Sequence, residues 1–182
     1  MASDILDISA RLRLEPLAQS HAAALFACVE QNRSHLRRWL AWLDSTTSAA
    51  HIDAFIASEV DKRRLQSAAT YAVFCDDGLC GAAGFRTLDK AIGVGELGYW
   101  LAENHTGKGL MTEVAARLVR HGFDTLALQR IEIHCATENL PSRRVAESLG
   151  ARLLHIQKHA ALLYDHYVDH AIYVLDNPGS EH

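Results

Sequence analysis

The chain has 182 residues, enough for one domain with a sizeable hydrophobic core. Hydrophobic residues make up 49% of it and charged residues 22%, a balance that excludes an intrinsically disordered protein. Its formal net charge of −4 gives it no electrostatic reason to bind DNA or RNA, because such binding depends on clustered Lys and Arg. We therefore expect a globular protein with no nucleic-acid partner.

The N-terminus and the cysteines indicate where the protein works. Residues 1–10 lack the basic-then-apolar pattern of a signal peptide, and no apolar run is long enough to span a bilayer. The four cysteines show no C-x-x-C spacing, and three of them lie in apolar surroundings typical of buried free thiols. We expect a cytoplasmic protein with no membrane partner.

The first third of the chain is expected to be mainly helical. Leucines that alternate with charged residues over 10–17 predict an opening strand. Apolar residues at helical spacing then predict helices over 21–30 and 33–43. Ser48 is expected to cap a third helix that runs to about residue 65.

From residue 70 onward strands predominate. The pattern predicts three strands over 70–75, 79–88 and 95–101, followed by an amphipathic helix that begins at residue 110. A fourth strand over 130–136 and a short helix over 140–149, capped by Gly150, come next. Two final strands are expected over 151–157 and 167–175. The order predicts a mixed α/β fold with helices on both faces of one sheet. Since there is no repeat and no linker, we expect a single domain over 1–182.

Gly107-Lys108-Gly109 lies between a predicted strand and a predicted helix. Two glycines let the backbone turn tightly, so that successive N–H groups and the helix N-terminus can bind one diphosphate. A loop that simply needs two glycines explains the motif as well. Leu110 follows Gly109 and no third glycine has fingerprint spacing, so neither a P-loop nor a dinucleotide motif is present. The loop favours a phosphate-bearing ligand other than ATP or NAD.

Three segments taken together resemble the GNAT acetyltransferase superfamily. They are Gly95-Glu96-Leu97-Gly98-Tyr99-Trp100-Leu101, Gly107-Lys108-Gly109 with Leu110-Met111-Thr112-Glu113, and Asn139-Leu140-Pro141-Ser142 before Leu149-Gly150. The early Asn32-Arg33-Ser34-His35-Leu36 and Trp39-Leu40-Ala41-Trp42 are similar to its RimL/RimJ branch, which acetylates N-terminal amines of ribosomal proteins. The resemblance covers about residues 11–175 and lies in the order and spacing of the segments.

The resemblance implies a GNAT-like fold, with a mostly antiparallel twisted sheet that is splayed at its middle strands. Acetyl-CoA would then place its pantetheine arm between the strands over 95–101 and 130–136. A backbone N–H near Tyr99, Trp100 or Leu101 would polarise the thioester carbonyl. The family's Gln/Arg-x-x-Gly-x-Gly/Ala pattern falls on Asn104, Gly107 and Gly109, with Asn104 departing from the usual Gln or Arg.

In the same family pattern, the amides of Leu110 and Met111 would complete the pyrophosphate site, and Lys108 would add charge unless it is simply an exposed lysine. Asn139 resembles the residue that bonds the pantetheine arm. It is also suited to cap the helix that begins near Leu140, and both roles are compatible.

Direct attack of an amine on the thioester needs a proton acceptor and a donor to the departing thiolate. Glu96 is the candidate base, because alternation places it beside apolar Val94 and Trp100. An exposed or substrate-positioning glutamate is an equally good interpretation. His134 is a rival base, although a lone histidine in a sheet is more often structural.

The usual acid tyrosine of the family falls on Ala146, which cannot donate a proton. Ser142, three residues after Asn139, matches the branch of the family in which a serine lies near the sulfur, so the resemblance makes it the candidate donor. A plain role in the first turn of the helix is the alternative. Tyr164 is a weaker candidate.

The 11 histidines raise the question of a metal site. The richest stretch is Tyr164-Asp165-His166-Tyr167-Val168-Asp169-His170. Because it leads directly into a predicted strand, a terminal hairpin explains it better, and we predict no metal.

The leading hypothesis is therefore acetyl transfer from acetyl-CoA to a primary amine, first of all the N-terminus of a ribosomal protein. A small-molecule amine acetyltransferase, a non-catalytic acyl-CoA-binding module and another nucleotide-binding α/β protein are the alternatives. Trp39 and Trp42 bracket Leu40 and are compatible with a homodimer or with core packing.

Overall fold

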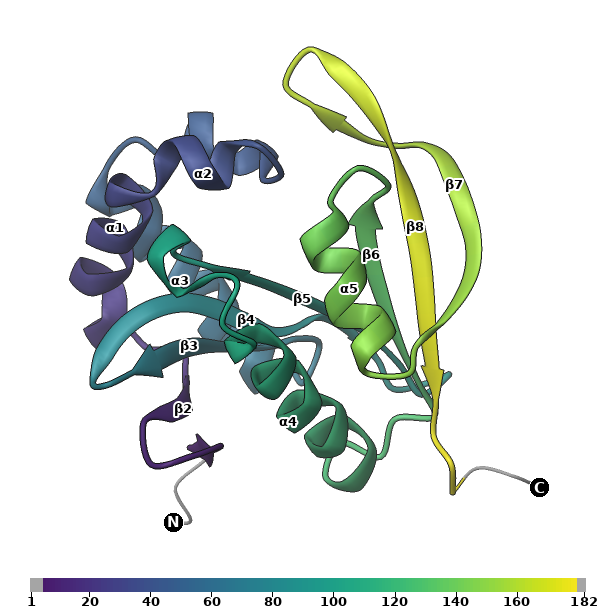
Figure 1. The fold of residues 1–182 in the computed structure, drawn as a ribbon. Helices are drawn as coiled ribbons and strands as arrows, with labels where there is room; N and C mark the ends of the chain where they lie inside the picture. Colours follow the sequence, from purple (N-terminus) through teal and green to yellow (C-terminus); the bar gives the residue numbers. More distant parts are fainter. Residues whose placement is uncertain (1–4, 180–182) are drawn as a thin grey trace.

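One eight-stranded sheet runs through residues 5–179, the part of the chain that this computed structural model describes (Figure 1). The strand order is β1-β2-β3-β4-β5-β6-β8-β7, and every neighbouring pair except β5 and β6 is antiparallel. The strands are β1 (Leu6–Asp7), β2 (Leu12–Pro16), β3 (Ala69–Cys75), β4 (Gly78–Asp89), β5 (Val94–Leu101), β6 (Arg130–Ala136), β7 (Arg152–Leu163) and β8 (His166–Asp176). The mixed α/β fold is confirmed.

Helices cover both faces of this sheet and create two hydrophobic cores. The helices are α1 (Ala22–Gln31), α2 (Arg33–Arg37), α3 (Ala49–Arg64), α4 (Leu110–Asp124) and α5 (Leu140–Ser148), with short 3-10 turns η1 (Gln19–His21), η2 (Ala41–Ser45) and η3 (Glu103–His105). One core lies under α4 and α5, and the other lies under α1–α3. Along β5, Leu97 and Leu101 belong to the first core while Trp100 packs against the second. The side chains of successive β5 residues therefore point to opposite faces of the sheet.

The two middle strands pair over only three residues before they separate. Val94, Gly95 and Glu96 of β5 lie opposite Arg130, Ile131 and Glu132 of β6. Beyond Glu96, β5 continues to Leu101 along β4, whereas β6 continues to Ala136 along β8 (Figure 1). The expected splay is confirmed, and we call this opening the fork.

The helix expected over 33–43 is wrong as a continuous element. It ends at Arg37, and the chain folds back before η2, with Leu40 in an extended conformation. The Arg33 guanidinium donates hydrogen bonds to the carbonyl oxygens of Leu43 and Thr46, and this tertiary contact holds the fold-back. Leu36 and Leu43 are both buried as a result.

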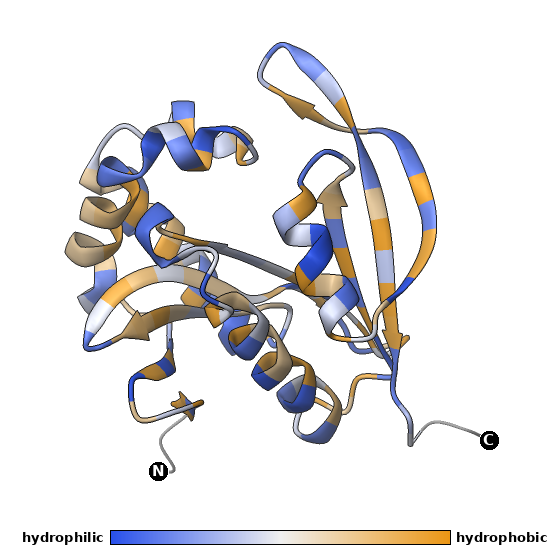
Figure 2. Cartoon of the chain, viewed as in Figure 1, coloured by the Kyte–Doolittle hydropathy of each residue, from blue (hydrophilic) through white to orange (hydrophobic). Residues whose placement is uncertain are grey.

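The last hairpin is longer than its sequence pattern indicates. The strand expected over 151–157 runs to Leu163, and its partner begins at His166. Figure 2 shows hydrophilic and hydrophobic residues alternating along β8 and much of β7. Because β7 is an edge strand and mostly exposed, its pattern carries little information about where it ends.

No helix within the described residues is both long and apolar enough to cross a membrane.

The core under α4 should carry much of the stability. Leu118 on α4 is fully buried, so Leu118→Ala should lower the free energy of unfolding by about 2–5 kcal/mol. Urea denaturation followed by circular dichroism measures the loss. Leu65→Ala, at a side chain that is 73% exposed, is the matched control and should change stability by less than about 0.5 kcal/mol. Equal losses would contradict the packing described.

Candidate active site

The loop between β5 and α4 has the shape of an open anion cradle. Gly107 and Gly109 have φ angles of 71° and 78°, in the left-handed region that favours glycine. A Cβ built at either position would meet nothing within 4 Å. The glycines are therefore required by backbone conformation, and the space above them is open to a ligand.

The amides at the start of α4 complete this cradle. The first bond of the helix joins the Glu113 N–H to the Gly109 carbonyl at 3.2 Å. The N–H groups of Leu110 and Met111 precede it and are among the first four that a helix leaves without internal partners. Together with the helix dipole they favour a bound phosphate. Lys108 turns back on the loop, since its Nζ donates to the Asn104 carbonyl at 2.7 Å.

Asn32 fixes the position of the cradle relative to α1. Its Oδ1 accepts from the Glu103 N–H at 2.8 Å, and its Nδ2 donates to the Cys28 carbonyl at 2.8 Å. In the sequence, Asn32 stands out only as part of the motif Asn32-Arg33-Ser34-His35-Leu36. The contact joins residues 71 positions apart, so no local pattern indicates it.

A hydroxyl pair bridges the fork on the face covered by α5. The Tyr99 hydroxyl donates to the Ser142 carbonyl at 3.1 Å and accepts from the Ser142 Oγ at 3.3 Å. Burial raises the pKa of Tyr99, so its phenol remains protonated. The family resemblance implies a role only for the backbone of Tyr99, and this contact of its hydroxyl is an addition to it. The alternation that groups Tyr99 with Leu97 and Leu101 was the signal that could have placed its ring beside α5.

The helix-capping role expected of Asn139 is confirmed. Its side chain accepts a hydrogen bond from the Ser142 N–H at 3.3 Å, at the start of α5. This bond fixes the first turn of α5, and with it the Ser142 hydroxyl, at the edge of the fork. A contact between Asn139 and the pantetheine arm stays a prediction.

The opposite face of the fork carries Glu96, and its surroundings are more polar than expected. Arg86 Nη1 lies 3.1 Å from Glu96 Oε1. The Arg86 side chain crosses β5 over Gly98, where an added Cβ would come within 2.5 Å of the Arg86 Cδ. Glu96 therefore shares its face with Val94 and Trp100 as alternation predicts, but its nearest charged partner is a guanidinium, for which Gly98 leaves room.

His134 is not an isolated histidine. Its Nε2 lies 2.8 Å from Glu132 Oε2, and its Nδ1 lies 3.9 Å from Glu96 Oε1. Sequence alternation could have paired Glu132 with His134, but the proximity of Glu96 depends on the strand order. Trp100, on the same face as Glu96, packs towards Trp42 at a ring separation of 6.4 Å.

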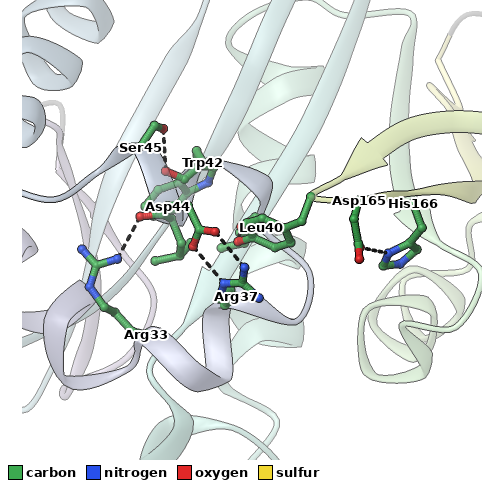
Figure 3. A network of polar contacts seen from close by, with 10 residues as sticks. Arg33, Arg37, Leu40, Trp42, Asp44, Ser45, Asp165 and His166 are labelled. Carbon is green, nitrogen blue, oxygen red and sulfur yellow. Dashed lines mark hydrogen bonds and ion pairs between the residues drawn. The ribbon is translucent and has the colours of Figure 1, made fainter.

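The hairpin tip is tied to the α2–η2 segment. The Tyr164 hydroxyl donates to the Leu40 carbonyl at 2.6 Å, and the Arg37 guanidinium lies 3.8 Å from the centre of the Tyr164 ring. Arg37 in turn forms two hydrogen bonds to Asp44, at 2.8 and 2.7 Å (Figure 3). The proton that Tyr164 would supply as an acid is thus engaged in this bridge.

A hollow of about 490 Å³ lies beside the bridge. Its walls come from the end of α2, the end of β6 and the loop that follows it, and the hairpin; they include Arg38, Trp39, Ala136, Thr137, Tyr167 and Asp169. Ala136 is the last residue of β6, so the hollow lies at the end of that strand.

No group of three or more His, Cys, Asp or Glu side chains in residues 5–179 is arranged to hold a metal ion. Asp165 and His166 instead pair with each other at 2.9 Å (Figure 3), and Asp169 pairs with Lys158 at 2.7 Å.

Comparison with known proteins gives consistent matches. The family described as the acetyltransferase (GNAT) domain matches residues 11–152. The ribosomal-protein-serine acetyltransferase of Escherichia coli K12 is 27% identical over 171 residues, covering 94% of this chain and 96% of the relative. A putative ribosomal N-acetyltransferase of Bacillus subtilis, YdaF, is 29% identical over 147 residues, 79% of each chain. The structure of RimL, a ribosomal L7/L12 alpha-N-protein acetyltransferase bound to coenzyme A, superposes with a TM-score of 0.92 at 26% identity, covering 95% and 98%.

The bridge at the hairpin tip can be tested directly. Tyr164→Phe removes the partly buried hydrogen bond to the Leu40 carbonyl. The free energy of opening the hairpin tip should fall by about 1 kcal/mol as a result. Hydrogen–deuterium exchange should then be faster in the hairpin tip and around Leu40. Tyr167→Phe, on the same hairpin with a 62% exposed side chain, is the control and should leave exchange unchanged. Identical exchange in both variants would rule out a bridging role.

Proposed function

The chain belongs to the GNAT acetyltransferase family and is an acetyl-CoA-dependent N-acetyltransferase, and from this premise we propose that its acceptor is a protein N-terminal amine. The observation that carries the proposal is the fork, with a phosphate cradle at one end and the acceptor hollow at the other. The names of the E. coli relative and of RimL support a ribosomal protein as the acceptor. We further propose that residues 1–182 form a single domain of this kind.

The residues of the cradle fit the pyrophosphate of acetyl-CoA. Gly107 and Gly109 leave open space, and the amides of Leu110 and Met111 supply donors. Asn104 and Lys108 complete the loop, and Lys108 can exchange its bond to the Asn104 carbonyl for one to a phosphate. Bound acetyl-CoA supplies an activated acyl group, while this chain binds and orients it.

The fork fits the pantetheine arm. Past Glu96, the inner edge of β5 has no partner in β6, so backbone groups in the stretch of Tyr99, Trp100 and Leu101 are free to bond the arm and the thioester carbonyl. Asn139 lies at the far side of the opening and caps α5, with its amide nitrogen available to the arm.

The donor and acceptor of protons then lie on opposite faces of the fork. Ser142 lies on the α5 side with the protonated Tyr99 behind it, and is proposed to donate to the departing thiolate. The amine side is the other face, where Glu96 either accepts a proton or attracts the amine by its charge, and where Trp100 packs towards Trp42 of η2. This separation suits direct transfer in a ternary complex, since the amine and the leaving thiol occupy opposite sides of the acyl carbon.

A small-molecule amine is the second candidate acceptor. The hollow is only about 490 Å³, and Leu163 and His166, on either side of the hairpin turn, are among the residues that line it. A small amine would fill such a space, while a protein would insert only its terminal residues. A homodimer, residence in the cytoplasm and independence of metals and nucleic acid stay predictions.

The test is acetyl-CoA turnover, followed as free-thiol release, against peptides with different N-terminal residues and a panel of small amines. Faster release with peptides, together with an acetylated N-terminus in the mass spectrum, supports the proposal. Release with small amines alone would keep the chemistry and remove the protein acceptor.

Ser142→Ala should lower kcat on the order of 100-fold without changing the Kd for acetyl-CoA, because a donor to developing charge is lost while the cradle is intact. Stopped-flow thiol release and calorimetry measure the two quantities. Ser148→Ala, at the exposed end of the same helix, is the control. An unchanged kcat in Ser142→Ala would exclude Ser142 as the donor.

Gly109→Ala should weaken acetyl-CoA binding roughly tenfold, because the added Cβ enters the open space of the cradle. The left-handed backbone conformation also makes the substitution cost about 1–2 kcal/mol of stability. Gly150→Ala is a matched control: its φ is 80° and its Cβ would also meet nothing within 4 Å. Both variants should lose similar stability, but only Gly109→Ala should lose affinity. Calorimetric titration with acetyl-CoA distinguishes them, and equal affinities would contradict the cradle.

A further inference from the structure

Five ionisable side chains gather on the sheet face opposite α5, where the fork begins. They are Arg86 on β4, Glu96 on β5, Glu132 and His134 on β6, and His170 on β8. Glu96 and Glu132 face each other in the last residue pair that joins β5 and β6. His134 lies two residues further along β6, already inside the opening.

The contact with Glu132 defines how His134 presents its ring. Glu132 Oε2 lies 2.8 Å from His134 Nε2, and an ionised carboxylate can only accept a hydrogen bond. Nε2 therefore carries the hydrogen in the neutral ring, and Nδ1 keeps its lone pair. Nδ1 is the atom that faces Glu96 and the fork, at 3.9 Å from Glu96 Oε1. A carboxylate that orients an imidazole in this way leaves the other nitrogen ready to accept a proton.

Glu96 is engaged differently. Its Oε1 lies 3.1 Å from Arg86 Nη1. Gly98 has no side chain and so leaves room for the Arg86 side chain to reach Glu96. A carboxylate committed to a guanidinium is suited to attract an ammonium group by charge. Its Oε1 is engaged by Arg86, whereas Nδ1 of His134 keeps its lone pair.

The charged groups that face His134 come from all four strands of the cluster. Burial lowers the pKa of His170, and the charges of His134 and Arg86 act in the same direction against Glu96, so His170 is neutral at neutral pH. Two carboxylates and one guanidinium then leave one net negative charge beside His134.

We propose that His134, positioned by Glu132, takes the proton of the acceptor amine, and that Glu96 attracts the amine in its ammonium form. In this step an N–H bond of the ammonium breaks and an Nδ1–H bond forms, which leaves a neutral amine and an imidazolium. The amine lone pair then forms the bond to the acetyl carbon, and the thiolate leaves with the electron pair of the C–S bond. His134 returns its proton to solvent. This assignment rests on the proposed acetyl transfer.

The kinetic test compares His134→Gln with wild type over pH 5.5–9, with an acceptor amine on which wild type turns over. We expect kcat/KM of His134→Gln to fall roughly 100-fold or more. The fall of the wild-type rate towards acidic pH should be lost, and the Kd for acetyl-CoA should not change. His155→Gln, at an exposed histidine of β7, is the control and should keep the wild-type profile. A His134→Gln enzyme with the wild-type rate and profile overturns the proposal.

A structural readout keeps this inference separate from the choice of acceptor. Nitrogen NMR of the histidine rings should show His134 with hydrogen on Nε2 in wild type, and a mixture of tautomers in Glu132→Gln. Glu132→Gln should also lower kcat with little change in KM, and Glu132→Asp should restore part of it. Hydrogen on Nδ1 in neutral wild-type protein overturns the assignment, even if no acceptor is found. Absence of thiol release by wild type with every amine would instead count against the proposed acceptor.

Discussion

The short parallel contact between β5 and β6 is the constraint on which the site depends. β5 is held along its length by β4, and β6 is held along its length by β8, so each strand has one full partner and one brief one. Past Glu96 and Glu132 the inner edges of both strands carry backbone groups that the sheet does not satisfy. A ligand arm with amide groups meets this need, since it can bond both edges as a strand would. In the proposed function, the fork is thus the binding site for this arm, made where the pairing of two strands stops.

The same divergence of β5 and β6 leaves two groups of polar side chains on opposite faces of the sheet. Because side chains alternate across a sheet, neighbouring β5 residues reach opposite faces. Tyr99 meets Ser142 on the α5 side, and Glu96 meets Arg86 and the Glu132–His134 pair on the other. In the proposed mechanism, proton donation and proton uptake therefore take place in different surroundings, a buried hydroxyl pair and a partly exposed cluster of charges. Tyr99 and Glu96 reach these two surroundings from a single strand, β5.

Local sequence patterns predict those parts of the fold that are determined locally. The strand over 130–136 was placed at its observed bounds, because its residues alternate between a buried and a partly exposed face. The glycines of the loop were identifiable because a positive φ is a local demand. The break after Arg37 was not, since it depends on Arg33 reaching carbonyls ten or more positions away. The end of β7 was missed because an exposed edge strand has no buried face to create a pattern.

Most of the site is set by which strands become neighbours, and for that reason only its outline could be predicted. Glu96, Ser142 and the loop were chosen from motifs, but Arg86 and the hydroxyl of Tyr99 join them only through the strand order and the docking of α5.

The proposed acceptor hollow is even harder to predict from the sequence, because the residues that line it come from segments far apart in the chain. Tyr164 contacts Leu40 across 124 positions, and the bridge includes Arg37 and Asp44 from a segment that has no regular periodicity. These contacts lie outside the fork, so changes in them leave the cradle and the strand pairing intact. Proteins of this family can therefore share the fork and differ in acceptor. The residues that distinguish their acceptors should be sought where α2, η2 and the hairpin meet.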